Sequence, residues 1–136
     1  MPIRRALLDP DHSSHQAAMS WFGKHAGEGW ASSPITQNGC IRVMSSPGYP
    51  KPIPTQAVIR RLADACRDSV HEFWADDVSL LDSQLIDATR IHGPRQLTDV
   101  YLLALAVRRQ GRFVTFDASV AVEAVRGATT QHRLVL

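Results

Sequence analysis

Residues 96–117 read Gln-Leu-Thr-Asp-Val-Tyr-Leu-Leu-Ala-Leu-Ala-Val-Arg-Arg-Gln-Gly-Arg-Phe-Val-Thr-Phe-Asp, and this stretch decides the fold. Its first part, residues 96–107, is apolar on nearly every face, which is typical of a buried helix. Basic residues in the last turn and Gly111 just beyond them predict where this helix ends. Residues 112–116 form a short run rich in strand formers. The stretch therefore predicts a buried helix followed directly by a strand that runs back in the opposite direction.

This return brings two aspartates, Asp99 and Asp117, to the same edge of the fold. A helix from Asp99 to Gly111 rises about 18 Å at about 1.5 Å per residue. The strand comes back about 17 Å at about 3.3 Å per residue. Two carboxylates brought together suit a hard divalent cation such as Mg²⁺ or Mn²⁺. Either aspartate alone would more often be structural than catalytic, because helix first turns and strand ends both favour this residue. The return that brings them together makes the two interpretations about equal.

The rest of the chain alternates between strand-like and helix-like segments. The expected strands are residues 30–33, 72–75, 112–116 and 132–136. The expected helices are one that ends near Gly27, then 34–44, 54–66, 79–91 and 96–107, and a short helical piece after Asp117. This order predicts an α/β fold with a mainly parallel central sheet flanked by helices. Sites in such sheets gather at the carboxyl ends of the strands, where Gln37 and the pair Asp76–Asp77 are also expected.

Length and composition predict one domain over residues 1–136. The hydrophobic fraction of 44% and the charged fraction of 21% are those of a globular protein in water. The two cysteines, Cys40 and Cys66, lack metal-type spacing and indicate free thiols in a reducing compartment. We found neither a signal-peptide core nor a membrane-length apolar run, so we expect a cytoplasmic protein with no membrane partner.

The net charge of +2 is unevenly distributed along the sequence. Residues 1–63 and residues 90–136 each carry seven bases and three acids, whereas residues 64–89 carry one base and seven acids. Two basic ends around an acidic centre permit an anionic partner on one face, although an ordinary mixed surface would give the same counts.

Four sequence blocks resemble the PIN-domain ribonuclease toxins of VapBC toxin–antitoxin systems. They are Trp30–Gly39, Phe73–Asp77, Gln96–Asp99 and Val114–Asp117. The resemblance runs from about Leu7 to Leu136, with the blocks in order and suitably spaced. It implies a three-layer PIN-like fold and endonucleolytic cleavage of RNA by a water that Mg²⁺ or Mn²⁺ activates. It also implies a VapB-like antitoxin as partner, and a homodimer.

The resemblance places a cluster of three or four acids at the carboxyl edge of the sheet. Asp99 and Asp117 match two of these positions. A third, a glutamate early in the helix after the second strand, falls on Gln37, whose neutral amide offers an oxygen but no charge. Asp99, Asp117 and Gln37 are thus the expected catalytic residues, with the two aspartates as metal ligands.

The fourth position, an aspartate that ends the first strand, has no clear match. Only eight residues precede Asp9, and Pro2, Arg4 and Arg5 suit a buried strand poorly. We therefore expect the first strand to be truncated or absent, which leaves three explanations open. The true start could lie upstream of Met1, or the chain could be a catalytically degenerate PIN domain that only binds antitoxin or RNA. Alternatively, residues 5–9 form the first strand and Asp9 is the missing metal ligand.

Overall fold

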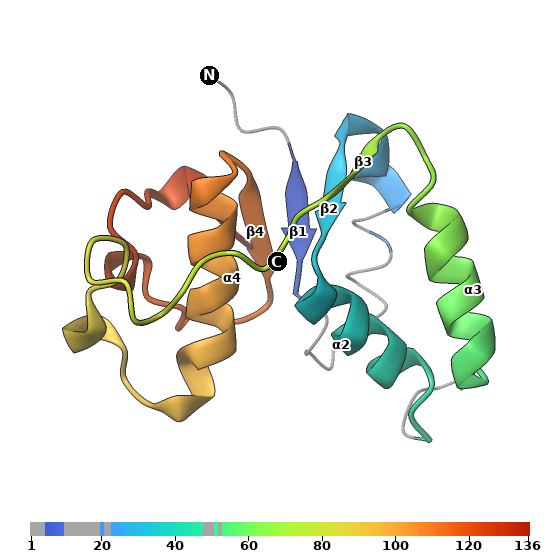
Figure 1. Ribbon diagram of the computed structural model, residues 1–136, viewed down its shortest axis with the longest axis horizontal. Helices are drawn as coiled ribbons and strands as arrows, with labels where there is room; N and C mark the ends of the chain where they lie inside the picture. Colours follow the sequence, from blue (N-terminus) through green and yellow to red (C-terminus); the bar gives the residue numbers. More distant parts are fainter. Residues whose placement is uncertain (1–4, 10–19, 21–22, 48–50, 52) are drawn as a thin grey trace.

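A computed structural model describes residues 5–9, 20, 23–47, 51 and 53–136. Within these residues, five parallel strands form one sheet in the order β3-β2-β1-β4-β5, with helices around it (Figure 1). The strands are β1 (Ala6–Leu8), β2 (Trp30–Ser32), β3 (His71–Phe73), β4 (Arg112–Thr115) and β5 (Arg133–Val135). The predicted α/β class with a parallel sheet is confirmed.

The expectation that the first strand is truncated or absent is wrong, because β1 is the central strand of the sheet. Ala6 pairs with Trp30 of β2 on one side and with Arg112 of β4 on the other. Three apolar residues suffice for a strand whose two neighbours both hydrogen-bond to it. Arg5 does not disturb β1, since its guanidinium lies beside Glu72 at 3.3 Å and donates to the Val70 carbonyl.

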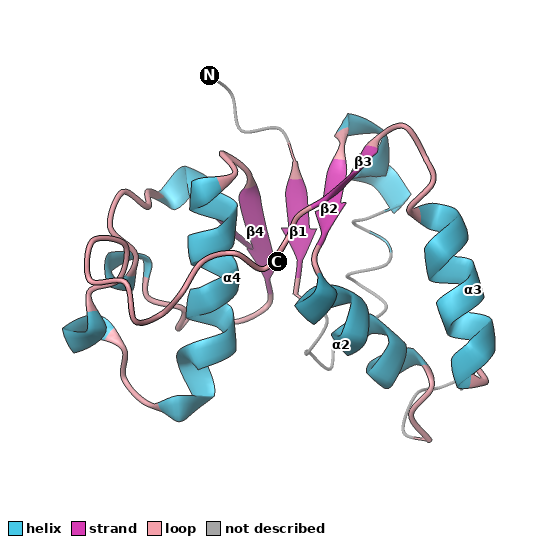
Figure 2. Cartoon of the chain, viewed as in Figure 1, coloured by secondary structure: helices cyan, strands magenta, loops and turns pink. Residues whose placement is uncertain are grey.

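Three α-helices lie among the described residues, close to where the sequence predicts them (Figure 2). They are α2 (Pro34–Met44), α3 (Thr55–Ala65) and α4 (Leu97–Arg108). The short 3₁₀ helices are η1 (Ala26–Glu28), η2 (Ala88–Arg90), η3 (Pro94–Gln96), η4 (Val122–Ala124) and η5 (Thr130–His132). Residues 20 and 23–25 are helical, as predicted before Gly27. The apolar residues at 17, 18, 21 and 22, which would form the buried face of a helix there, lie outside the described residues. No described helix has the length and apolar character needed to cross a membrane.

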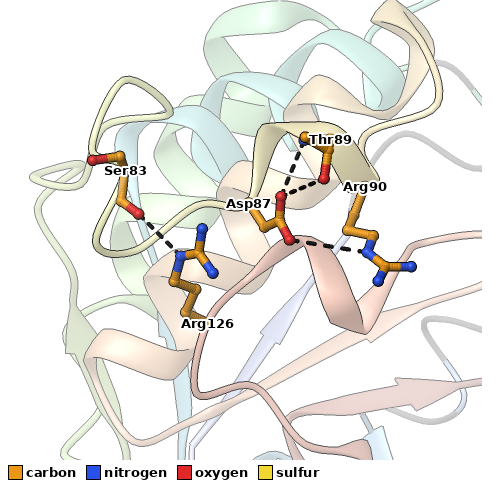
Figure 3. Close-up of polar contacts among 5 residues, drawn as sticks. All are labelled: Ser83, Asp87, Thr89, Arg90 and Arg126. Atoms are coloured by element: carbon orange, nitrogen blue, oxygen red, sulfur yellow. Dashed lines mark hydrogen bonds and ion pairs between the residues drawn. The ribbon is translucent and has the colours of Figure 1, made fainter.

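The predicted helix over residues 79–91 is wrong. The segment forms turns, the short helix η2 and an antiparallel bridge between Ile86 and Val125. Figure 3 shows Asp87 at the start of η2, where Thr89 donates to it through its backbone N–H and through its hydroxyl, at 3.2 and 2.6 Å. Both hydrogen bonds lower the pKa of Asp87, and the bond from the Thr89 hydroxyl has the larger effect. A side chain that bonds the backbone in this way competes with a continuous helix, which explains the turns.

At Gly111, which lies between α4 and β4, the surrounding atoms approach so closely that only a glycine fits. A Cβ added there would lie 2.3 Å from the ring of Trp74 and 2.8 Å from the Arg5 carbonyl oxygen. Trp74 is fully buried, and its indole N–H donates to Glu72 at 2.7 Å, so the ring cannot easily move away. The glycine therefore allows the end of α4, β1 and Trp74 to pack together.

We predict that Gly111→Ala lowers the free energy of unfolding by about 1–3 kcal/mol, because the added methyl group overpacks the Trp74 site. Urea denaturation measures the change. Gly27→Ala is the matched control, since a Cβ at Gly27 meets nothing within 4 Å. Equal stability of the two variants would contradict this account of the packing.

Candidate functional site

The site is built around Asp9, which follows β1 at the carboxyl edge of the sheet. The backbone N–H of Asp9 donates to the Val114 carbonyl at 2.9 Å, which extends the pairing of β1 with β4 by one residue. The Thr115 hydroxyl donates to a carboxylate oxygen of Asp9 at 3.1 Å. Asp9 and Thr115 are only 2% and 0% exposed. The first and fourth strands thus present a buried carboxylate and a buried hydroxyl side by side.

Thr115 also connects Asp9 to Asp117. The Asp117 backbone N–H donates to the Thr115 hydroxyl oxygen at 3.1 Å, so one hydroxyl joins both acidic residues. Ser119 then holds the Asp117 carboxylate, donating from its N–H at 2.8 Å and from its hydroxyl at 2.6 Å. The turn after β4 is therefore ordered by its own side chains.

The same turn is tied to the start of α4, where Asp99 lies. The side-chain amide of Gln96, the residue before α4, donates to the Ser119 carbonyl at 3.1 Å. Asp99 follows three residues later in the first helical turn and is 8% exposed. Figure 1 shows α4 running beside β4, and the chain passes from its C-terminal end through Gly111 into the start of that strand. The first turn of α4 therefore lies at the carboxyl edge of the sheet, beside the turn that carries Asp117.

Gln37 approaches this edge from α2. Ser33 caps α2 in a reciprocal arrangement, in which its hydroxyl accepts from the Thr36 N–H and the Thr36 hydroxyl accepts from the Ser33 N–H. Because Leu7 pairs with Ala31, the cap lies level with Asp9 on the neighbouring strand. The side-chain amide of Gln37 donates to the hydroxyl of Ser32 at 2.9 Å.

The donor set suits a hard cation that keeps part of its water shell. Among the residues that the structure describes, no group of three His, Cys, Asp or Glu side chains is arranged to enclose a metal ion. Mg²⁺ needs no such cage, because it is usually held by one or two carboxylates and several waters. The carboxylates of Asp9 and Asp99 are buried, and a buried carboxylate is costly unless hydrogen bonds or a cation offset its charge. The oxygen-only chemistry of the site fits Mg²⁺ or Mn²⁺.

The other acids at this end of the fold have structural partners. Asp76 accepts a hydrogen bond from the Ile35 N–H at 2.9 Å and so binds the first turn of α2. Asp77 pairs with Arg109 at 2.9 Å. These contacts give both aspartates a structural role in the segment after β3.

Sequence reasoning missed one polar neighbour of the site, His71. Nε2 of this residue lies 2.8 Å from the Ser32 hydroxyl oxygen, directly behind Gln37. Histidines are scattered through the sequence, and only the pairing of β2 with β3 brings this one to Ser32.

Comparisons with known proteins identify the family. Ribonuclease VapC44 of Mycobacterium tuberculosis is 54% identical over 131 residues, which cover 96% of this chain and 92% of the relative. Ribonuclease VapC39 of the same organism is 40% identical over 123 residues, or 90% of this chain and 88% of the relative. Ribonuclease VapC38 is 44% identical over 119 residues, or 85% and 80%. No protein-family model matches the chain. The chain belongs to the VapC family of PIN-domain toxins.

We predict that Thr115→Val destabilises the protein by about 1–3 kcal/mol, because it removes a buried hydroxyl that is bonded to two acidic residues. Valine keeps the shape of threonine, so the change reports on the hydrogen bonds. Thr89→Val is the matched control, since the Thr89 hydroxyl also bonds an aspartate but does so at the surface. Chemical denaturation should show a much smaller effect for the control, and similar losses would contradict a special role for Thr115.

A second prediction concerns pH and His71. Burial is the largest influence on this imidazole and lowers its pKa; nearby Arg5 lowers it further, whereas a hydrogen bond to the Cys66 backbone and the Glu72 carboxylate oppose the shift. A histidine whose pKa is lower in the folded state stabilises the fold fully above its unfolded pKa, which is about 6.5. That contribution is lost as the pH falls from about 6.5 through the folded pKa.

We therefore expect the free energy of unfolding to fall more steeply below pH 6.5 in the wild type than in His71→Gln, which has no titrating ring. Denaturation curves at several pH values between about 7 and 5 measure both slopes. Parallel slopes in this window would show that the pKa of His71 does not differ between the folded and unfolded states.

Proposed function

We propose that this chain is the toxin of a type II toxin–antitoxin module and cleaves RNA endonucleolytically with Mg²⁺ or Mn²⁺. The observation that carries the proposal is the continuous set of contacts from Asp9 through Thr115 and Asp117 to the start of α4. It supports a common site for three acids from three separate segments. The relatives named ribonucleases support RNA as the substrate.

In this proposal one or two of the Asp9, Asp99 and Asp117 carboxylates bind the metal directly, and the remaining acid interacts with it through its bound waters. When bound, the ion activates a water as nucleophile and offsets charge on the phosphate. Thr115 positions two of the acids from the buried side, since its hydroxyl donates to the Asp9 carboxylate and accepts from the Asp117 backbone N–H. Gln37 adds a neutral polar group at the rim, so the protein contributes a charge of about −3 from these acids rather than −4.

Three partners follow from the same proposal. RNA supplies the phosphate on which the metal acts, and a VapB-like antitoxin covers the site, with an arginine as a suitable group to face its acids. We also propose a homodimer in the cytoplasm, on family resemblance alone.

Asp99→Asn and Asp117→Asn test the proposal directly. Each substitution removes one negative charge from the metal site and should lower Mn²⁺-dependent cleavage of structured RNA by about 100-fold or more. Asp87→Asn is the control, because Asp87 lies in the η2 turn and should leave cleavage unchanged. Gel-based cleavage assays provide the rates, and circular dichroism checks that each variant is folded. Cleavage that survives EDTA or Asp99→Asn would refute the mechanism.

Because the Gln37 side chain carries no charge, the alternative function is a catalytically degenerate PIN domain that binds an antitoxin or RNA. The position of Asp9 after β1 weakens this alternative, since it raises the number of candidate acids from two to three. A thermal shift on adding millimolar Mg²⁺ would favour the enzyme. No shift in a protein that still binds its antitoxin would favour the binding module.

A further inference from the structure

Gln37 belongs to a partly buried chain of hydrogen bonds that leads away from the acids. Its side-chain nitrogen lies 2.9 Å from the hydroxyl oxygen of Ser32, which is only 4% exposed. The same oxygen lies 2.8 Å from Nε2 of His71 and 3.7 Å from the Cys66 sulfur. Three elements, α2, β2 and β3, therefore meet through one hydroxyl group.

The chemistry of these groups fixes the direction of each bond. The amide nitrogen of Gln37 can only donate, so the Ser32 oxygen accepts from it. We take the tautomer of His71 that carries its proton on Nδ1, in agreement with the influence of the Cys66 backbone, which raises the pKa of the imidazole. In the neutral ring the other nitrogen, Nε2, is then an acceptor, and the Ser32 hydroxyl supplies its proton. With this tautomer the hydrogen bonds run in one direction, from Gln37 to Ser32 to His71.

The His71 ring is held from several sides. Its centroid lies 4.3 Å from that of the Trp30 ring at an angle of 55°, in a tilted contact. Arg5 and Glu72 are the charged groups that act on it, and they pair with each other at 3.3 Å. The acceptor nitrogen is therefore presented to Ser32 by a ring with little freedom to turn.

This arrangement selects one of the two orientations of the Gln37 amide. If the amide turned over, its oxygen would face a Ser32 oxygen whose proton is already given to His71, and two acceptors would be opposed. In the observed orientation the amide nitrogen of Gln37 faces Ser32, so the amide oxygen is not the atom that bonds Ser32. An oxygen is the atom that a hard cation or its bound water requires.

We propose that Ser32 and His71 are positioning residues, which orient Gln37 so that its amide oxygen serves the reaction at the carboxyl edge. The inference rests on the proposed function of the site. Groups that orient a ligand from behind typically contribute about 10- to 100-fold to activity. Here they explain how a neutral glutamine works at a position where the family has a charged glutamate.

A double-mutant cycle with Ser32→Ala and Gln37→Ala separates positioning from general stability. Ser32→Ala should lower kcat for Mn²⁺-dependent RNA cleavage about 10- to 100-fold. In the Gln37→Ala background, the same substitution should have no further effect, because the group that it orients is already gone. Ser45→Ala is the control, since the Ser45 hydroxyl bonds only the far end of α2, at the Ile41 carbonyl.

Two substitutions of His71 test the acceptor. His71→Gln offers an acceptor oxygen near the position of Nε2 and should retain most of the activity, whereas His71→Phe should match Ser32→Ala. The proposal would be overturned if Ser32→Ala lowered kcat by the same factor in the wild type and in the Gln37→Ala variant.

The tautomer of His71, measured by nitrogen NMR on the metal-free protein, tests the chain without any assay of activity. An unprotonated Nε2 and a protonated Nδ1 support it, and a protonated Nε2 overturns it. If the wild type fails to cleave RNA with Mn²⁺, the proposed function fails, while the tautomer still decides whether Ser32 and His71 orient Gln37.

Discussion

The pairing of β1 between β2 and β4 is the constraint on which the rest of the structure depends. Asp9 reaches Thr115 only because its backbone continues the β1–β4 ladder by one residue. The cap of α2 lies level with Asp9 only because β2 pairs on the other side in matching register. Three residues of strand therefore align the three segments that carry the site.

Around β1, hydrogen bonds made by side chains fix the relative positions of the segments that carry the candidate acids. Thr115 serves two acidic residues, and Ser119 joins the turn after β4 to the residue before α4. Hydroxyl groups suit this task because each can accept and donate at once. Neutral groups thus help to fix Asp9 and Asp117 in place.

Much of the fold could be predicted from local patterns. The apolar run of α4, with Gly111 after it, and the strand formers of β4 gave the unit that carries Asp99 and Asp117. The central strand could not be predicted in the same way, since Ala6–Leu8 is too short for a pattern and Arg5 beside it argues against burial. Only the partners of Arg5, Glu72 and the Val70 carbonyl, make that position acceptable.

The helix predicted over 79–91 failed for a related reason. Its apolar residues, such as Ile86, are buried by pairing with residues distant in the sequence, and no local pattern records this. The contact of Ser32 with His71 likewise depends on which strands are neighbours. Sequence reasoning thus pointed to the candidate acids and missed the contacts of Gln37 and Ser32 with the neighbouring strand.

The central claim is that Asp9, Asp99 and Asp117 share one cation. Paramagnetic broadening by Mn²⁺ tests it most directly, because the effect on each backbone amide signal falls steeply with distance from the ion. We predict that the signals of residues 9, 99 and 117 broaden together at the lowest Mn²⁺ concentrations, while that of Asp87 remains sharp. Broadening that begins at Asp87 or Asp82, or that separates Asp9 from the other two acids, would contradict the account.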